Sequence, residues 1–291
     1  MRYAVLLFLF LANMQLSVMA QQKTDSLILH FWDSLYVSEL VAQDKETELI
    51  SFVIDEMPAF MELLSGCSSA SLVADVYSSV MAEAEDAGAE SLWYCMRDMA
   101  EDYFHGSNSS FRNDEIYIPI LERLVASRYM SESDSTRYGF QLKMMKKNRI
   151  GDFATDIDMR IYRMGHSEHL DGQRVEVGQK VKLSEVCGDS AFVLFYDPAC
   201  DHCLHQIEAF RNDEHIISLC KEGSLRMIFI NVEPKSKHRG DGKKCLERIP
   251  EGWIFAKDYK REVVKNQAYY LPFVPQLYVL GKNMKIMKKG L

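Results

Sequence analysis

Apart from its N-terminus, the sequence has no apolar run approaching the roughly 20 residues that a membrane-spanning helix needs. The N-terminal run, residues 3–16, is shorter than that and is interrupted by Asn13 and Gln15. Because a positive residue precedes it and small residues ending at Ala20 follow it, residues 1–20 are predicted to be a cleaved secretory signal peptide. The mature protein is therefore expected to be periplasmic or secreted, with no stable membrane insertion after cleavage.

Cysteines are few and scattered, seven in 291 residues. They stand at Cys67, Cys95, Cys187, Cys200, Cys203, Cys220 and Cys245. This number and spacing exclude a small domain held together by disulfides, and an odd count leaves at least one thiol without an internal partner. Only Cys200 and Cys203 are close in sequence. A further thiol–disulfide relay among Cys187, Cys220 and Cys245 is left open.

Basic residues are scarce in the first half of the chain. Residues 21–150 hold 22 Asp and Glu against 11 Lys and Arg, a net charge of −11, whereas residues 151–291 hold 20 against 22, a net charge of +2. Nucleic-acid binding is not expected of so acidic a chain, because phosphate contacts need a basic face. Hydrophobic residues make up 47% of the sequence, which is typical of a globular protein.

The periodicity of apolar residues changes near residue 150. Residues 21–150 repeat apolar side chains at three- and four-residue steps, which predicts a compact all-α bundle without a fixed-period repeat. Residues 151–291 instead contain short β-rich runs and a helix over 203–219. Strands are predicted at 159–163, 174–177, 191–196, 225–232, 253–256, 276–280 and 284–287. The sequence therefore predicts an α+β protein of two domains, a helical domain (21–150) followed by an α/β domain with a mixed sheet (151–291).

The residues Cys200-Asp201-His202-Cys203 lie between a predicted buried strand and a predicted helix. Two cysteines three residues apart at the start of a helix share one face and can form a disulfide. The positive end of the helix dipole favours the thiolate of Cys200 and so lowers its pKa. Cys200 is thus predicted to be the nucleophile and Cys203 the thiol that resolves the mixed disulfide. His202 favours the Cys200 thiolate, Asp201 opposes it, and the sequence does not decide between them.

A second element, Val274-Pro275, enters a predicted strand about 70 residues after the cysteines. Together with the strand, Cys-x-x-Cys and helix, it resembles the thioredoxin-like thiol–disulfide oxidoreductases, specifically the exported TlpA/ResA group, over residues 150–291. In that group the proline is cis and faces the disulfide, and the residue before it offers backbone hydrogen bonds to the substrate. This implies substrate-binding roles for Pro275 and Val274. The helical half, especially residues 111–117, is similar to a domain of unknown function found ahead of such domains in Bacteroidetes-type secreted proteins.

The resemblance implies an enzyme of cell redox homeostasis whose redox-active centre is the Cys200–Cys203 disulfide, with no other cofactor and no metal. Its expected partners are protein thiols and disulfides of the cell envelope and a membrane-linked electron donor, with reduction the favoured direction. The sequence departs from the group at Leu194, where the group carries a buried acid, so that Glu233 or water is left to assist Cys203. It also lacks the group's last helix, which leaves one sheet face open or covered by the helical domain.

Three other interpretations of the motif remain open. A zinc site would use the neighbouring His202 and His205, although no second Cys/His pair stands at ligand spacing. A peroxidase of the thioredoxin-like class usually has Thr or Ser three residues before the reactive cysteine, where this chain has Asp197. A binding module of the cell envelope would keep the thioredoxin fold without redox turnover.

Overall fold

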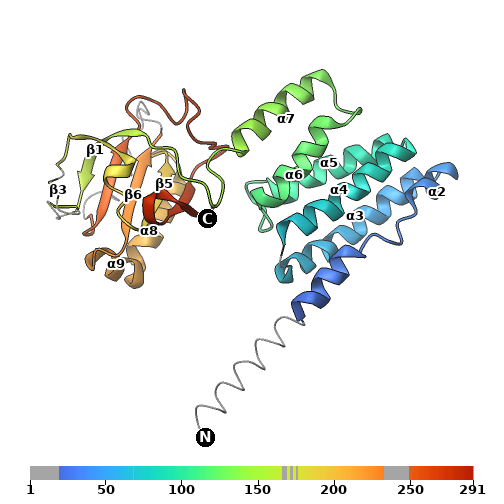
Figure 1. Cartoon of the computed structure of the whole chain (residues 1–291), viewed down its shortest axis with the longest axis horizontal. Helices are drawn as coiled ribbons and strands as arrows, with labels where there is room; N and C mark the ends of the chain where they lie inside the picture. The colour runs from blue at the N-terminus through green and yellow to red at the C-terminus, as the bar shows by residue number, and fades with distance from the viewer. Residues whose placement is uncertain are drawn as a thin grey trace, which may run out of the picture. The chain divides into compact units, whose positions relative to one another are not determined.

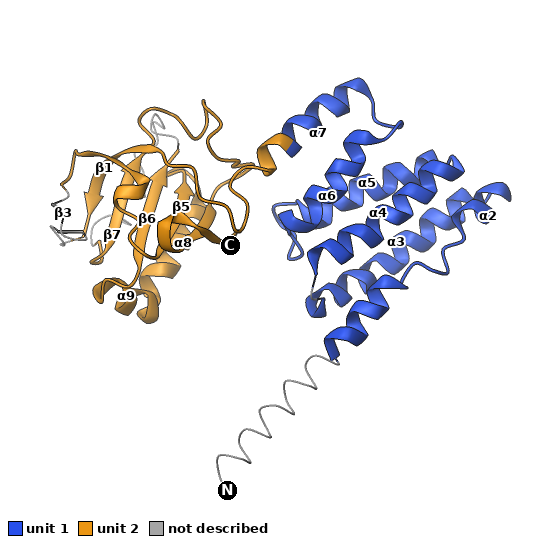
Figure 2. Ribbon diagram, in the orientation of Figure 1, with its two compact units in different colours: residues 1–142 blue, residues 143–291 orange. Residues whose placement is uncertain are grey.

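The computed structural model describes residues 20–67, 69–165, 169–170, 173–174, 176–232 and 249–290 (Figure 1). The chain divides into two compact units, residues 1–142 (unit 1) and 143–291 (unit 2), each of which is described by itself (Figure 2). The division lies inside helix α7 (Glu132–Met145), whereas the change of sequence pattern that predicted a boundary lies at residues 150–151. Of the predicted signal peptide, residues 1–19 lie outside the described part of the chain.

Unit 1 is helical, as the apolar periodicity predicts. After a helical segment over residues 20–29, its elements are α2 (Val37–Ala42), α3 (Glu46–Leu63), the 3-10 turn η1 (Leu64–Gly66), α4 (Ala70–Ala87), α5 (Glu90–Phe104), α6 (Asp114–Ala126) and α7. Helix α4 packs against α2, α5 and α6, and Tyr77, Trp93 and Phe104 are fully buried between them. Gly88 ends α4 in a left-handed conformation, with φ 79°, that glycine adopts without strain. None of the helices described combines the length and apolarity needed to cross a membrane.

Unit 2 is built on a seven-stranded mixed sheet with the strand order β4-β1-β7-β6-β5-β8-β9. The strands are β1 (Asp158–Met164), β4 (Lys180–Lys182), β5 (Ala191–Tyr196), β6 (Arg226–Asn231), β7 (Trp253–Lys257), β8 (Gln276–Leu280) and β9 (Ile286–Lys289). The central strands β5, β6 and β7 are parallel, and the other neighbours are antiparallel. A separate hairpin joins β2 (His169–Leu170) to β3 (Gln173–Arg174). The predicted combination of an all-α bundle and a mixed α/β sheet is thus confirmed.

The central strands of the unit 2 sheet are buried on both faces. Along β5, Val193 and Phe195 belong to the core on one face, and Leu194 and Tyr196 to the core on the other. Helices α8 (Asp201–Asn212) and α9 (Glu214–Lys221) cover the second face. The first face is covered by the 3-10 turn η2 (Leu183–Glu185) and by the segment between β7 and β8, which contributes Val263 and Tyr269 to its core. The expectation that this face is open or covered by the helical domain is therefore wrong, because residues of unit 2 cover it.

Two predicted elements of unit 2 are wrong in detail. The single helix expected over 203–219 is two helices, because the Asp213 carboxylate accepts hydrogen bonds from the backbone of His215 and Ile216 at 3.0 and 3.1 Å and starts a new helix. Of the strand expected at 174–177, Arg174 ends β3 and residue 175 lies outside the described residues. Residues 176–179 form a turn, in which Gly178 has φ 95° and the Glu176 N–H donates to the Gln179 side chain. The regular strand that follows is β4.

Candidate functional site

The turn between β5 and α8 positions Cys200. The Asp197 side chain accepts a hydrogen bond from the Ala199 N–H at 2.8 Å, and the Asp197 carbonyl oxygen accepts one from the Cys200 N–H at 3.0 Å. These two bonds close a tight turn around Pro198 at the carboxyl end of a buried strand. Cys200 then has an extended backbone and stands directly before α8 as its N-cap. The sequence thus folds locally so that the first cysteine occupies the positive end of a helix.

Cys200 and Cys203 lie together, with different exposure. The Cys203 N–H donates to the Cys200 Sγ at 3.3 Å, so the sulfur of Cys200 replaces the oxygen of an ordinary capping side chain. Both thiols are free, Cys200 is partly exposed, and Cys203 is completely buried. A helix N–H that points at a sulfur stabilises negative charge on it. The arrangement presents one accessible sulfur to a partner and keeps a second sulfur one turn behind it.

Val274 and Pro275 complete the site from the other side of β5. The Val274–Pro275 peptide bond is cis, and β8 begins at the next residue, Gln276. The Cys200 thiol donates a hydrogen bond to the Val274 carbonyl oxygen, with 3.7 Å between sulfur and oxygen. The structure therefore brings Cys200, Cys203 and Val274-Pro275 into one place, although 74 positions separate Cys200 from Val274 in sequence.

The thiol of Cys203 has its pKa raised well above the usual value, chiefly because burial disfavours the thiolate and also because it interacts with Cys200. A hydrogen bond with the Asp197 backbone opposes this rise. Leu194, at the position where the resemblance would place an acid, is fully buried in the same core as Cys203. Glu233, the other predicted source of help, lies outside the described residues. Deprotonation of Cys203 is thus the step that this site makes difficult.

This raised pKa predicts how Cys203 reacts with an alkylating agent. In the Cys200→Ser variant, the rate of Cys203 modification by iodoacetamide is expected to rise about tenfold per pH unit from pH 7 to 9 without reaching a plateau, because only the thiolate reacts. Peptide-resolved mass spectrometry of quenched samples measures this rate. In urea the same thiol should level off near an ordinary pKa of about 8.5. A plateau below pH 9 in the folded protein would contradict the assigned environment.

Asp201 and His202 occupy the first turn of α8, and both side chains are exposed. Water and salt weaken the effect of exposed charges on a neighbouring group. Their predicted opposing influence on Cys200 therefore stays a prediction.

A pair of tyrosines at the end of β5 was not predicted. The hydroxyl groups of Tyr162 and Tyr196 are hydrogen-bonded to each other, and burial raises the pKa of Tyr162 to about 12. Tyr196 is the residue before Asp197, and its pKa is raised chiefly by burial, then by Tyr162 and, to a smaller extent, by the electrostatic influence of Cys203. No local signal in the sequence pairs the two side chains, because Tyr162 reaches this face at an irregularity of β1 between Ile161 and Arg163.

The other sequence hypotheses find little support in the geometry. Cys187 and Cys220 belong to the cores on opposite faces of the sheet, so the hypothesis of a relay between them is wrong, and Cys245 lies outside the described residues. Within the described ranges, no group of three or more His, Cys, Asp and Glu side chains is arranged to hold a metal ion. The histidines of the zinc hypothesis, His202 and His205, are both exposed.

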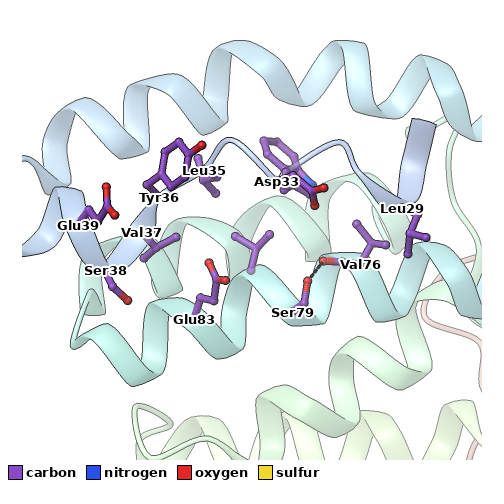
Figure 3. A pocket seen from close by; sticks show the side chains of 12 residues that line it. Leu29, Asp33, Leu35, Tyr36, Val37, Ser38, Glu39, Val76, Ser79 and Glu83 are labelled. Carbon is purple, nitrogen blue, oxygen red and sulfur yellow. Dashed lines mark hydrogen bonds between the residues drawn. The ribbon is translucent and has the colours of Figure 1, made fainter. Parts of the chain in front are cut away.

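Unit 1 contains a cavity of about 510 Å³ (Figure 3). Helix α4 forms one wall, and the segment that leads into the start of α2 forms the other. Its walls combine apolar side chains with the carboxylates of Asp33, Glu39 and Glu83. Inside it, the Ser79 hydroxyl donates to the Val76 carbonyl oxygen. No cysteine or histidine lines this cavity, and it contains none of the residues predicted to be functional.

Comparison with known proteins agrees with this architecture. Residues 15–148 match a family described as a domain of unknown function, DUF5106. A thioredoxin-like protein from Bacteroides caccae superposes with a TM-score of 0.74 at 23% identity, over 94% of this chain and 90% of that chain. A conserved protein of unknown function from Bacteroides fragilis is 20% identical over 49% of this chain and 92% of that chain, with a TM-score of 0.40. The thioredoxin domain of a thiol-disulfide oxidoreductase from Bacteroides vulgatus is 17% identical over 49% of this chain and 89% of that chain, with a TM-score of 0.37. No curated protein matches the sequence.

Unit 2 therefore has a thioredoxin-like fold, which is the fold that its Cys-x-x-Cys motif and Val-Pro element predicted. The chain thus combines this fold with an N-terminal region, residues 15–148, that is similar to the domain of unknown function DUF5106.

Proposed function

We propose that the protein is an exported thiol–disulfide oxidoreductase that exchanges its Cys200–Cys203 dithiol with disulfides of protein substrates. The observation that carries this proposal is the partly exposed Cys200 thiol at the start of α8, whose sulfur accepts a hydrogen bond from the N–H of the fully buried Cys203. A sulfur held by helix N–H groups reacts as a nucleophile, and a second sulfur one turn away can complete an exchange.

In the first step, the Cys200 thiolate attacks one sulfur of a substrate disulfide. The substrate S–S bond breaks, its electron pair leaves with the other substrate sulfur, which takes up a proton, and a mixed disulfide with Cys200 forms. Cys203 then loses its proton and attacks the Cys200 Sγ, which releases the second substrate thiol and leaves the Cys200–Cys203 disulfide. Two electrons have passed to the substrate, and a dithiol donor restores the reduced protein. The Val274 backbone, which lies against Cys200, would hold the substrate chain during the attack.

The proposed setting is the cell envelope. The predicted signal peptide would direct the chain out of the cytoplasm and into the cell envelope. Disulfides persist in that compartment, so a disulfide reductase has substrates there. The proposed partners are envelope proteins with cysteines and a membrane-linked electron donor, and the disulfide itself serves as the redox centre.

The proposal is tested by redox equilibration. The purified protein is incubated in glutathione buffers of graded ratio, the remaining thiols are alkylated, and the linkage is mapped by mass spectrometry. Cys200 and Cys203 are expected to join and open together as one two-electron couple, while Cys187 and Cys220 stay reduced because both are buried. A Cys200–Cys203 pair that stays open at every ratio would contradict the proposal and leave a binding module. The metal content of the same sample tests the zinc interpretation.

A further inference from the structure

Three cations form a row across the sheet of unit 2. Arg160 on β1 lies directly opposite Lys180 on β4 and, on its other side, directly opposite Lys257 on β7. Their neighbours in sequence are buried in the core of the other face, namely Ile161 beside Arg160, Val181 beside Lys180 and Ala256 beside Lys257. Because side chains alternate along a strand, the three cations share the face on which α8 and α9 lie. Arg160 and Lys180 are exposed, and Lys257 is partly exposed.

Such a row is unfavourable for the isolated protein. Like charges placed directly opposite each other destabilise neighbouring strands. Lys260, which follows β7, pairs with Asp158 on β1 and with Glu262, and none of the ion pairs described includes a member of the row. Among the described residues, the row is compensated by aromatic faces and, at Lys180, by the electrostatic influence of the Asp158 carboxylate, which Lys260 already pairs.

Two tyrosines supply these faces. The Arg160 guanidinium and the Lys180 ammonium lie 5.3 and 5.4 Å from the centre of the Tyr259 ring. The Lys257 ammonium lies 5.1 Å from the centre of the Tyr162 ring. A ring face attracts a cation without neutralising its charge, so the row keeps a net positive potential.

The row leads to the redox site. Lys257 lies opposite Asn231 at the end of β6, and Asn231 lies opposite Tyr196 at the end of β5, four residues before Cys200. Figure 2 shows β1, β7, β6 and β5 side by side in this order. With strands about 4.8 Å apart, Lys257 lies about 10 Å and Lys180 about 19 Å from β5. A protein interface covers about 800 Å² on each partner, a disc of about 16 Å radius, so a partner bound at Cys200 extends over most of the row.

We propose that the row Lys180–Arg160–Lys257 is a docking surface for an acidic segment of the protein that exchanges disulfides with Cys200. This inference rests on the proposed function and adds the charge of the partner. The three cations span about 10 Å, which is longer than one small anion and fits several carboxylates along a peptide segment. Carboxylates placed there relieve the repulsion between the strands and steer the partner to the site before the sulfurs meet.

The test compares two synthetic peptides that differ only in charge. Each carries one cysteine as a 2-pyridyl disulfide, one beside four Asp and Glu residues and the other beside four Ser and Gln residues. Reduced protein attacks the disulfide, and the absorbance of released pyridine-2-thione gives the second-order rate constant. The acidic peptide is expected to react about tenfold faster at low ionic strength, and the ratio should approach one at about 0.5 M salt.

Variants assign the effect to the row. Arg160→Gln/Lys180→Gln/Lys257→Gln is expected to bring the acidic-to-neutral ratio close to one, and the corresponding triple Glu variant should bring it below one. The matched control is Lys282→Gln/Lys285→Gln/Lys288→Gln, three exposed lysines near the β8–β9 turn. There Leu280 pairs with Ala191, so these lysines lie at the beginning of β5, away from Cys200. An unchanged ratio in the first triple variant, or an equal loss in the control, would overturn the proposal.

A binding measurement separates docking from chemistry. The anisotropy of a fluorescent acidic peptide without cysteine is titrated with Cys200→Ser/Cys203→Ser protein, with and without the three Gln substitutions in the row. Binding that disappears with these substitutions supports docking. If the reduced protein releases no thione, that result counts against the redox function alone and leaves docking supported. Equal thione release from both peptides by the wild type keeps the redox function and overturns docking. Tighter binding of a single-stranded oligonucleotide of equal charge would also overturn the choice of a protein partner.

Discussion

Replacing Cys200 by serine is expected to lower the rate of insulin reduction by dithiothreitol to the rate of dithiothreitol alone. The reason lies in the exposure of the two sulfurs, because Cys200 is the accessible one and Cys203 is completely buried. A serine hydroxyl can still cap α8, so the fold should persist while the nucleophile is lost. The onset and slope of insulin turbidity measure the effect.

Cys203→Ser is expected to give a different defect. When the reduced variant is freed of dithiothreitol and mixed with insulin, Cys200 should still attack an insulin disulfide, but the mixed disulfide should persist. Non-reducing electrophoresis should then show an adduct of the protein with insulin. Cys67→Ser is the matched control. Its thiol is partly exposed like that of Cys200, but it lies in unit 1 and should not affect the rate. Wild-type turbidity rates in Cys200→Ser would refute the assignment of the nucleophile.

The parts of unit 2 that the sequence predicted are those whose signal is local. The continuous apolar run at 191–196 predicted β5, because a strand buried on both faces does not need alternating polar and apolar residues. Both β5 and β8 have their predicted bounds. The apolar periodicity also continues across Asp213, and it therefore wrongly predicted one helix over 203–219. The Asp213 carboxylate caps a new helix there without interrupting the apolar pattern.

Apart from the contact of Val274 with Cys200, which the family resemblance implied, features that depend on pairing between distant segments were not accessible from the sequence. The cationic row needs the registers of β4, β1 and β7, which join residues far apart in the chain. The cover of one sheet face by Val263 and Tyr269 comes from a segment without helical or strand periodicity. In the same way, the absence of an acid at Leu194 was visible in the sequence, but the tyrosine pair that lies near Cys203 was not.

The aromatic stack beneath α8 and α9 carries the second large expected effect. Phe229 on β6 is completely buried, and its ring lies parallel to that of Phe255 with 4.4 Å between the centres and 4.8 Å from that of Trp253. Phe229→Ala removes these contacts and leaves a cavity in the core that also buries Cys203. Comparable substitutions cost about 3–5 kcal/mol. Unit 2 is therefore expected to lose about that much free energy of unfolding.

Hydrogen exchange followed by mass spectrometry can measure this loss in each unit separately. Peptides from β5, β6 and β7 should exchange faster in Phe229→Ala by the factor that corresponds to about 3–5 kcal/mol, whereas peptides from α4 and α5 of unit 1 should not change. Phe229→Leu is the matched control, because leucine fills most of the space and should cause a smaller change. Equal protection of β6 in the Ala variant and the wild type would mean that the stack does not hold this core together, and burial of Cys203 would then need another cause.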